Sequence, residues 1–324
     1  EGTVRFNEDL NTLEFYNGVD WRQFVIYGAG LGDRAIIGNG AADENQILTL
    51  NISSKGNTED FGTSVSEAYI RGYGSSTSRA ILNGGYGVDN AINTIEYVTI
   101  ATSGKGVDFG DTSAAHFRNC TASSSSTRNL MFGGGHPSYY NTIEYVEIAQ
   151  KSNGIDFGNL TQTGASRGSF SSPTRGFVSG GFPSYQKNYD MVTIASTGNA
   201  VDFGDMTANW FARGGAANNT RGIFAGGYSP NITAGGIIEF ITMASGGNFQ
   251  YFGDLTLARN YPGTTSSHTR AIFAAGYSSL GANSNVIDYV NIASSGNAMD
   301  FGDTNRVTTR YSATSNCHGG LGGF

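Results

Sequence analysis

Regularly spaced carboxylates are the side chains in this sequence with the clearest potential for chemistry. An Asp precedes a Phe-Gly pair at five places, which are Asp60, Asp108, Asp156, Asp202 and Asp300. A second Asp follows the pair at Asp111, Asp205, Asp254 and Asp303. Two carboxylates that flank a sugar could act as acid and base in glycoside hydrolysis. Because an active site is built once, the recurrence favours a structural role, in which these carboxylates bind backbone N–H groups in a turn or pair with repeated arginines.

Other arrangements that could support catalysis are weaker. The histidines fall in different parts of the chain without the spacing of a metal site, at His116, His136, His268 and His318. Asp-Phe-Gly holds magnesium in protein kinases, but a kinase uses the triplet once. Acidic calcium-binding loops and the Ser-x-Asp-x-Gly-x-Thr-Trp box of sialidase propellers do not occur in the sequence. We therefore expect no metal, no cofactor and no enzymatic activity, with a glycan-processing enzyme as the least favoured alternative.

The Asp-Phe-Gly segment belongs to a repeat that covers most of the chain. Its Phe recurs at intervals of 48, 48, 46, 49 and 49 residues, in the series Phe61, Phe109, Phe157, Phe203, Phe252 and Phe301. Each repeat also contains two arginines. The first opens a short apolar run that ends in glycines, at Arg34, Arg79, Arg128, Arg175, Arg221 and Arg270. The second begins a Ser/Thr-rich segment, at Arg71, Arg118, Arg167, Arg213, Arg259 and Arg310. This regularity indicates that the arginines serve the architecture.

The composition and the pattern within each repeat predict strands. The 48 glycines, with 14% charged and 12% aromatic residues, are typical of short strands joined by tight turns. A β-rich run such as residues 94–100 places Ile95 and Tyr97 on one face and Val98 and Ile100 on the other. A strand that is apolar on both faces must be covered twice. Four antiparallel strands in each repeat therefore predict an all-β propeller, whose blades stack face to face around an axis.

The two ends of the chain suggest how many blades there are. One period after Arg270 the sequence reaches His318, so residues 318–324 resemble a seventh opening strand. Residues 1–33 contain Arg22 and short apolar runs that resemble the other strands of a shortened repeat. We predict a single propeller over residues 1–324, with six repeats in residues 34–317 and a seventh blade built from residues 1–33 and a closing strand at 318–324. Such closure removes open sheet edges. Six blades with a separate N-terminal hairpin is the alternative.

Repeated motifs also resemble a known family. The Phe-Ala-Gly-Gly-Tyr of residues 224–228, the Asn-Ala-x-Asp-Phe-Gly-Asp of residues 199–205 and the Gly-Thr-Val-Arg-Phe-Asn of residues 2–7 are similar to kelch-like propeller repeats in tail fibres and other virion proteins of tailed phages, especially marine cyanophages. The resemblance covers the whole chain. It implies an extracellular virion component that assembles with other fibre subunits, as a homo-oligomer, and recognises a host-cell glycan or protein. The usual kelch repeat has a Trp in a later strand, whereas this chain has only Trp21 and Trp210.

The segments that differ between repeats are the candidate binding loops. They lie between the opening strand and the β-rich strand, and they combine Tyr with Ser, Asn and Gly, which is typical of adaptable recognition surfaces. We expect binding of host-surface sugars or of a partner protein by Tyr139, Tyr140, Tyr185, Tyr189 and Asn231. A purely architectural virion protein is the alternative.

Charge and hydropathy limit the remaining partners. The net charge is −7, and no run of Lys or Arg provides the basic footprint of a nucleic-acid-binding protein. No apolar stretch of about 18 residues occurs, so we expect no membrane insertion.

Overall fold

The computed structural model describes residues 3–7, 12–16, 18, 21–23, 33–88, 90–115, 121–135, 137–230 and 235–322. The chain divides into two compact units, Glu1–Gly32 and Asp33–Phe324. No helix in these described ranges is long and apolar enough to cross a membrane.

The N-terminal unit is a small antiparallel sheet. Its strands pair in the order β1 (Val4–Asn7), β2 (Thr12–Tyr16) and β3 (Trp21–Gln23). The Arg5 guanidinium lies 2.9 Å from Glu14 Oε2 and 4.0 Å from the centre of the Trp21 ring, so a cation ties the sheet together. These strands were expected to help close the propeller, but they form a sheet of their own.

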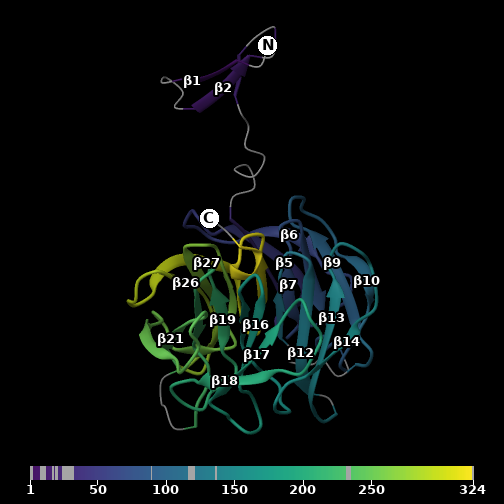
Figure 1. Ribbon diagram of the computed structural model, residues 1–324. Helices are drawn as coiled ribbons and strands as arrows, with labels where there is room; N and C mark the ends of the chain where they lie inside the picture. Colours follow the sequence, from purple (N-terminus) through teal and green to yellow (C-terminus); the bar gives the residue numbers. More distant parts are fainter. Residues whose placement is uncertain are drawn as a thin grey trace. The chain divides into compact units, whose positions relative to one another are not determined.

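The second unit is a propeller of six antiparallel blades (Figure 1). Blade 1 contains β28 (Ser312–Ser315), β4 (Arg34–Gly40), β5 (Asp43–Asn51) and β6 (Glu59–Thr63). Blade 2 contains β7 (Gly72–Ser75), β8 (Arg79–Asn83), β9 (Thr94–Thr99) and β10 (Val107–Asp111). Blade 3 contains β11 (Thr121–Ser124), β12 (Arg128–Gly135), β13 (Tyr139–Glu147) and β14 (Ile155–Asn159).

The other three blades repeat this order from the inner to the outer strand. Blade 4 contains β15 (Ser169–Ser171), β16 (Arg175–Ser179), β17 (Asn188–Thr193) and β18 (Val201–Asp205). Blade 5 contains β19 (Gly214–Ala217), β20 (Arg221–Ala225), β21 (Ile237–Thr242) and β22 (Gln250–Asp254). In blade 6 the inner strand is split into β23 (Arg259–Asn260) and β24 (Gly263–Ser266), followed by β25 (Arg270–Ser278), β26 (Asn283–Asn291) and β27 (Met299–Thr308).

The ring closes in blade 1, where β28 pairs with β4 from Ser312 opposite Gly38 to Ser315 opposite Ala35. The Ser/Thr-rich segment after the last Asp-Phe-Gly is therefore the inner strand of the first blade. This pairing completes the ring with six blades, so the expected seven are not formed and the alternative matches. The expected closing strand at residues 318–324 is not found in the described part of this segment, where Gly319–Leu321 form a 3₁₀ helix.

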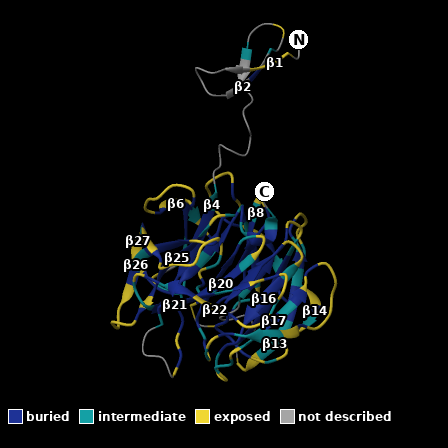
Figure 2. Cartoon of the chain, turned by 60° about the vertical axis from the view of Figure 1, so that its left-hand side comes forward, coloured by how far each residue is buried: buried dark blue, intermediate teal, exposed yellow. Residues whose placement is uncertain are grey.

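The hydrophobic core lies between neighbouring blades. Ile36 and Phe61 of blade 1, for example, pack with Leu82 and Val98 of blade 2. Figure 2 shows the buried residues within the strands and the exposed residues in the connecting turns. This double coverage explains why the third strand of each blade is apolar on both faces.

Serine hydroxyls join the inner strands near the axis. Each hydroxyl donates a hydrogen bond to the backbone carbonyl at the same position of the preceding blade, as Ser124 Oγ does to Ser75 O at 2.9 Å. Five of the six positions contribute such a bond, which are Ser75, Ser124, Ser171, Ser266 and Ser315. Ala217 occupies the sixth position, so the ring of hydroxyl bonds is interrupted once.

The opening arginines join each blade to the next one. Arg79 Nη1 of blade 2 donates to Ile148 O and Ala149 O of blade 3, at 3.0 and 2.8 Å. Equivalent bonds are made by Arg34, Arg128, Arg175, Arg221 and Arg270, and the last reaches back to blade 1. Each of the six guanidinium groups also lies over an aromatic ring of its own blade, at 4.6 to 5.8 Å. The arginines therefore form a closed circle of contacts between blades.

The Asp-Phe-Gly segment connects the outer strands through its backbone. Phe61 is buried, and its carbonyl accepts a hydrogen bond from Gly104 N of the next blade at 2.8 Å. Gly62 has a φ of 148°, and a Cβ there would lie 2.0 Å from Gly104 O, so only glycine fits.

The Asp of this segment does not have the expected partners. Five exposed side chains belong to this position, which are Asp60, Asp108, Asp156, Asp202 and Asp300. Within the described part of the chain, only Asp202 accepts a backbone hydrogen bond, from Gly204 N at 3.1 Å, and none forms an ion pair with an arginine. The expected pairing with arginine was wrong because the third strand supplies the carboxylates that the second arginines bind.

His318 plugs one end of the axis. Its Nε2 lies 3.1 Å from Ser124 Oγ and 3.2 Å from Ser75 O, while Nδ1 accepts a hydrogen bond from Gly320 N at 3.1 Å. Gly320 packs so tightly against the inner strand of blade 3 that a Cβ at this position would lie 1.9 Å from Ser124 O. Burial lowers the pKa of His318 to about 4, because the charged imidazolium would lose its hydration in this position.

We predict that Arg79→Met lowers the free energy of unfolding of the propeller by about 1.5–3 kcal/mol, because two charge-assisted hydrogen bonds between blades are lost. Denaturant titration measures this change. Asp108→Asn alters an exposed side chain and serves as the control, with a change of less than about 0.5 kcal/mol. Equal losses in the two variants would contradict the separate roles of these residues.

We also predict that His318 makes the propeller less stable in acid. Folding lowers its pKa from the ordinary value of 6.5 to about 4, so the unfolded chain binds a proton in this window that the folded chain does not. Stability due to this group is therefore lost as the pH falls from about 6.5 to about 4, by on the order of 3 kcal/mol. Unfolding curves of wild type and His318→Gln across this range isolate the effect, and parallel pH profiles would rule it out.

Candidate functional site

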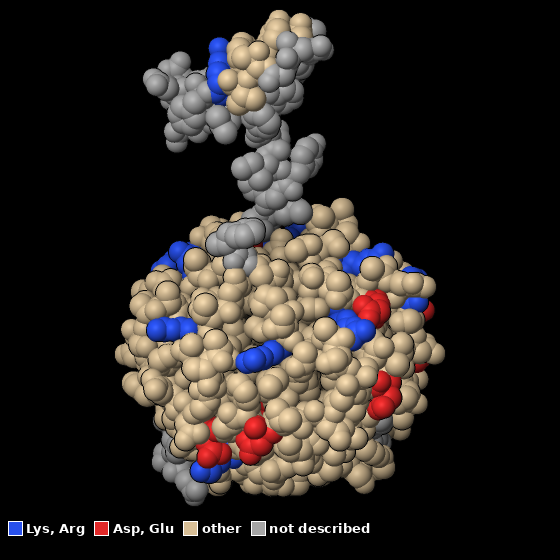
Figure 3. All heavy atoms as spheres, in the orientation of Figure 1, with Lys and Arg blue, Asp and Glu red and all other residues tan. Residues whose placement is uncertain are grey.

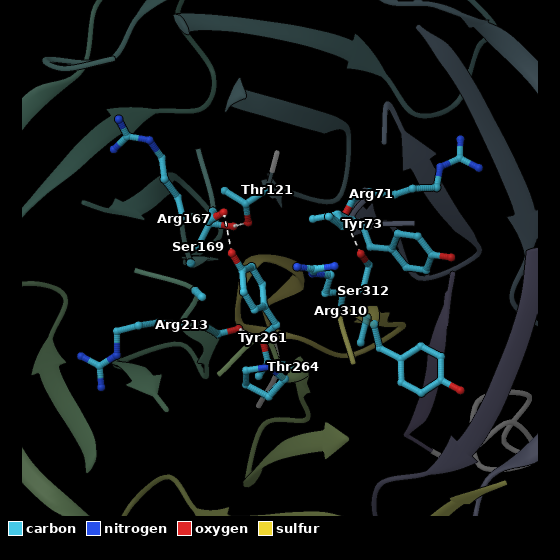
Figure 4. Close-up of a pocket in the computed structure, with 18 of the residues that line it drawn as sticks. Arg71, Tyr73, Thr121, Arg167, Ser169, Arg213, Tyr261, Thr264, Arg310 and Ser312 are labelled. Atoms are coloured by element: carbon cyan, nitrogen blue, oxygen red, sulfur yellow. Dashed lines mark hydrogen bonds between the residues drawn. The ribbon is translucent and has the colours of Figure 1, made fainter. Parts of the chain in front are cut away.

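The two ends of the propeller axis are different. All inner strands run in the same direction, so their ends gather around the plug of His318 and Gly319, while their starts surround an open mouth. The mouth contains a cavity of about 100 Å³, lined among others by Ser166, Tyr261 and Arg310. Figure 4 shows this mouth with the inner strands arranged around it. The mouth is the candidate functional site.

The residues just before the inner strands have an unusual backbone. Five residues without the freedom of glycine have φ values between 52° and 65°, namely Ile70, Ser166, Ala212, Tyr261 and Arg310. Backbone hydrogen bonds link four of them around the mouth, as Ala212 N donates to Ser166 O, Tyr261 N to Ala212 O, and Arg310 N to Tyr261 O, at 2.7, 2.8 and 3.2 Å. Residues held in this region of φ cluster at functional sites, where surrounding structure compensates the strain.

Aromatic rings continue from the mouth across the same face of the propeller. We call them the aromatic collar, which consists of Tyr69, Tyr86, Tyr139, Phe182, Tyr185, Phe211, Tyr228 and Tyr261. Within it, ring centres lie 5.5 Å apart for Tyr139 and Phe182, 5.8 Å for Phe182 and Phe211, and 6.3 Å for Phe211 and Tyr261. The rings of Tyr69 and Tyr86, 5.7 Å apart, belong to blade 2.

The collar is partly open to solvent. Tyr139 and Tyr228 have exposed fractions of 39% and 48%, and the other collar residues are half-buried. Several rings therefore present an edge or a face to solvent while their neighbours fix their orientation. Rigid tyrosines of this kind offer contact area and hydroxyl groups at a small entropic cost.

Arg310 is the cation at the mouth. Its guanidinium lies 5.2 Å from the centre of the Tyr261 ring and 5.9 Å from the centre of the Tyr69 ring. Arg310 therefore bridges the collar residues of blade 6 and blade 2. In Figure 4 the Arg310 side chain points into the mouth, whereas Arg71, Arg167 and Arg213 point away from it. In the described part of the chain no carboxylate forms an ion pair with Arg310.

The structure places the binding residues expected from the sequence in different environments. Tyr139 and Tyr185 belong to the collar, while Tyr140 is half-buried in β13 and pairs with Gly134 of β12. Tyr189 is completely buried, and its hydroxyl donates to Gly247 O at 2.6 Å. Its expected role in binding was wrong, because β17 begins at Asn188 and turns the next side chain into the core. Asn231 lies outside the described residues.

Several site residues were not anticipated, although the repeat carries a signal for them. An aromatic residue follows the two glycines of the opening strand at Tyr86, Phe182 and Tyr228, and another stands two residues before the second arginine at Tyr69 and Phe211. The isolated bridges Tyr69–Tyr86 and Phe211–Tyr228 bring these two positions together. Reading both positions across the repeats would have located the collar.

Metal-ligating side chains do not gather at the mouth. Among the described residues, no three His, Cys, Asp or Glu side chains lie together in a way that could hold a metal ion. His116 and His136 lie outside the residues that the structure describes.

In comparisons with known proteins, no family model matches this chain, and no curated protein matches it. The mouth and the collar therefore carry the functional proposal.

We predict that Tyr189 and Tyr185 differ sharply in their contribution to stability. Tyr189→Ala should lower the free energy of unfolding by about 3–5 kcal/mol, because it empties a fully buried aromatic position. Tyr185→Ala should cost about 1 kcal/mol, because this ring is half-buried. Chemical unfolding measures both values, and similar losses would mean that Tyr185 belongs to the core and not to the binding surface.

Proposed function

We propose that this protein is a non-catalytic binding module and that the aromatic collar binds carbohydrate. The observation that carries this proposal is the continuity of the collar from Tyr139 to Tyr261, where partly exposed rings of blades 3 to 6 pack against one another beside the mouth. The apolar faces of sugars pack on aromatic rings, and tyrosine hydroxyls supply hydrogen bonds to sugar hydroxyls.

The rigidity of the scaffold supports this role. Hydrogen bonds between blades and the packing of collar rings against one another hold the surface in one shape before a ligand arrives. A preorganised surface loses less entropy on binding than a flexible one.

The charges on one face of the propeller are spread out. On the face shown in Figure 3, Lys and Arg side chains are separated from one another by uncharged residues and do not merge into a patch. Such a distribution differs from the basic patch that nucleic-acid-binding proteins use.

The resemblance of the repeats to phage fibre proteins supplies the setting. We propose a virion or extracellular location, assembly with other fibre subunits as a homo-oligomer, and a host-cell glycan as receptor. Exposed Tyr277 and Leu280, at 43% and 83%, favour a protein contact as a second candidate, in which the collar face serves virion architecture or binds a host envelope protein.

We predict that Tyr228→Ala lowers glycan affinity about tenfold or more, because an exposed stacking surface is removed. Screening the whole chain on a glycan array and titrating the best glycan by calorimetry measures this loss. Tyr251→Ala is the matched control, since Tyr251 is 58% exposed but lies on the outer strand β22, away from the collar. Its affinity should equal that of the wild type. Unchanged affinity in the Tyr228 variant, or binding of virion proteins in place of any glycan, would overturn the proposal.

A further inference from the structure

We propose that Arg310 makes the mouth selective for sugars that carry a carboxylate, such as hexuronic acids. This inference rests on the proposed function, because the collar must bind the sugar whose carboxylate reaches Arg310. It concerns the chemical class of the ligand.

The second arginines of three other blades are neutralised inside the protein by ion pairs. Arg167 of blade 4 has no ion pair within the described ranges, and its Nη atoms donate to backbone carbonyls instead. Arg71 lies 3.0 Å from Glu96, and Arg259 lies 3.0 Å from Asp288, with all four side chains buried. Arg213 and Glu239 form the same kind of pair. Each acid comes from the third strand of the same blade and also accepts a backbone N–H, as Asp288 does from Thr256 at 3.1 Å. These pairs serve architecture.

Blade 1 departs from this arrangement at both positions. Leu48 pairs with Asp60 in the register where Glu96 pairs with Asp108, so a buried apolar residue replaces the acid. Ser312 pairs with Gly38 where Gly72 pairs with Asn83, so Tyr311 stands at the position of Arg71. The arginine of blade 1 is therefore displaced by one residue, to Arg310. Blade 1 therefore lacks the internal ion pair and has a cation that faces the mouth (Figure 4).

The surroundings of Arg310 leave its charge available to a ligand. Tyr69 and Tyr261 lie beside the guanidinium, and the Tyr261 hydroxyl is bonded to Ser166 Oγ at 3.1 Å. The Arg310 guanidinium forms no hydrogen bond and no ion pair with the described residues, whereas Arg71, Arg213 and Arg259 are each paired with an acid. A half-desolvated guanidinium without an acceptor gains from binding an anion, and its planar donors match the two oxygens of a carboxylate.

The size of the cavity places the ligand. At about 100 Å³ it admits a carboxylate group at Arg310, while the sugar ring itself lies on the collar outside. Hydroxyl groups of Ser312 and Thr264 also line the mouth. A cation that faces the mouth among aromatic rings distinguishes an acidic sugar from its neutral counterpart by one charge-assisted contact.

The test compares oligogalacturonides with their carboxyl-reduced, neutral counterparts by calorimetry at fixed salt, using the whole chain. The wild type should bind the acidic oligosaccharide at least tenfold more tightly. Arg310→Gln should lose this preference while keeping its affinity for the neutral sugar. Arg310→Lys should recover only part of the preference, because the charge returns without the fork of donors. Lys105→Gln removes one exposed positive charge elsewhere and should behave as the wild type.

Three outcomes would overturn the inference. They are an unchanged preference in Arg310→Gln, equal binding of acidic and neutral sugars by the wild type, and a stronger preference for a sulphated sugar than for the carboxylated one. Matching thermal unfolding of the Arg310 variants and the wild type shows that a lost preference is not a folding defect. Equal binding of both sugars with a loss in Tyr228→Ala overturns this inference alone. Failure of every glycan to bind overturns the proposed function as well.

Discussion

Hydrogen bonds that cross from one blade to the next are the constraint on which the rest of the structure depends. They act at three distances from the axis: serine hydroxyls join the inner strands, the opening arginines reach the carbonyls beyond the third strand, and the Asp-Phe-Gly backbone joins the outer strands. Every blade uses nearly the same donors and acceptors, so the same contact recurs around the ring. These contacts fix the positions of the blades and therefore the geometry of the mouth and the collar.

Much of the fold could be predicted because a repeat imposes the same environment many times. The recurrence of Arg79 and its equivalents indicated structural residues, and the apolar faces around Ile95 and Val98 indicated strands covered on both sides. The number of blades could not be predicted, because a sequence period does not show which strand begins a blade. The segment after Arg310 supplies the inner strand of blade 1, which only the pairing of β28 with β4 reveals.

The site was harder to predict than the fold, because side-chain direction depends on where a strand begins. Asn188 is half-buried, and the next residue, Tyr189, is fully buried. The carboxylates expected to pair with arginine, such as Asp108, are exposed, and Glu96 takes that place from the neighbouring strand. The most informative positions are those where one blade differs from the repeat. Leu48, Tyr311 and Arg310 all differ from the residues at the equivalent positions of other blades, and this combined difference identifies the mouth as the site.

The closure of the ring has a mechanical consequence. The four residues of β28 complete blade 1 from the C-terminal end of the propeller, and Arg34 N is bonded to Asn316 Oδ1 at 2.8 Å, so the propeller begins and ends side by side at the plugged face. Tension applied between these two points would load the β28–β4 ladder at its end and open its hydrogen bonds one after another, as in a zipper, and not all at once in shear. A force that enters the propeller through only one of these ends does not load the pairing of β28 with β4. Attachment at one end is therefore mechanically safer than attachment at both.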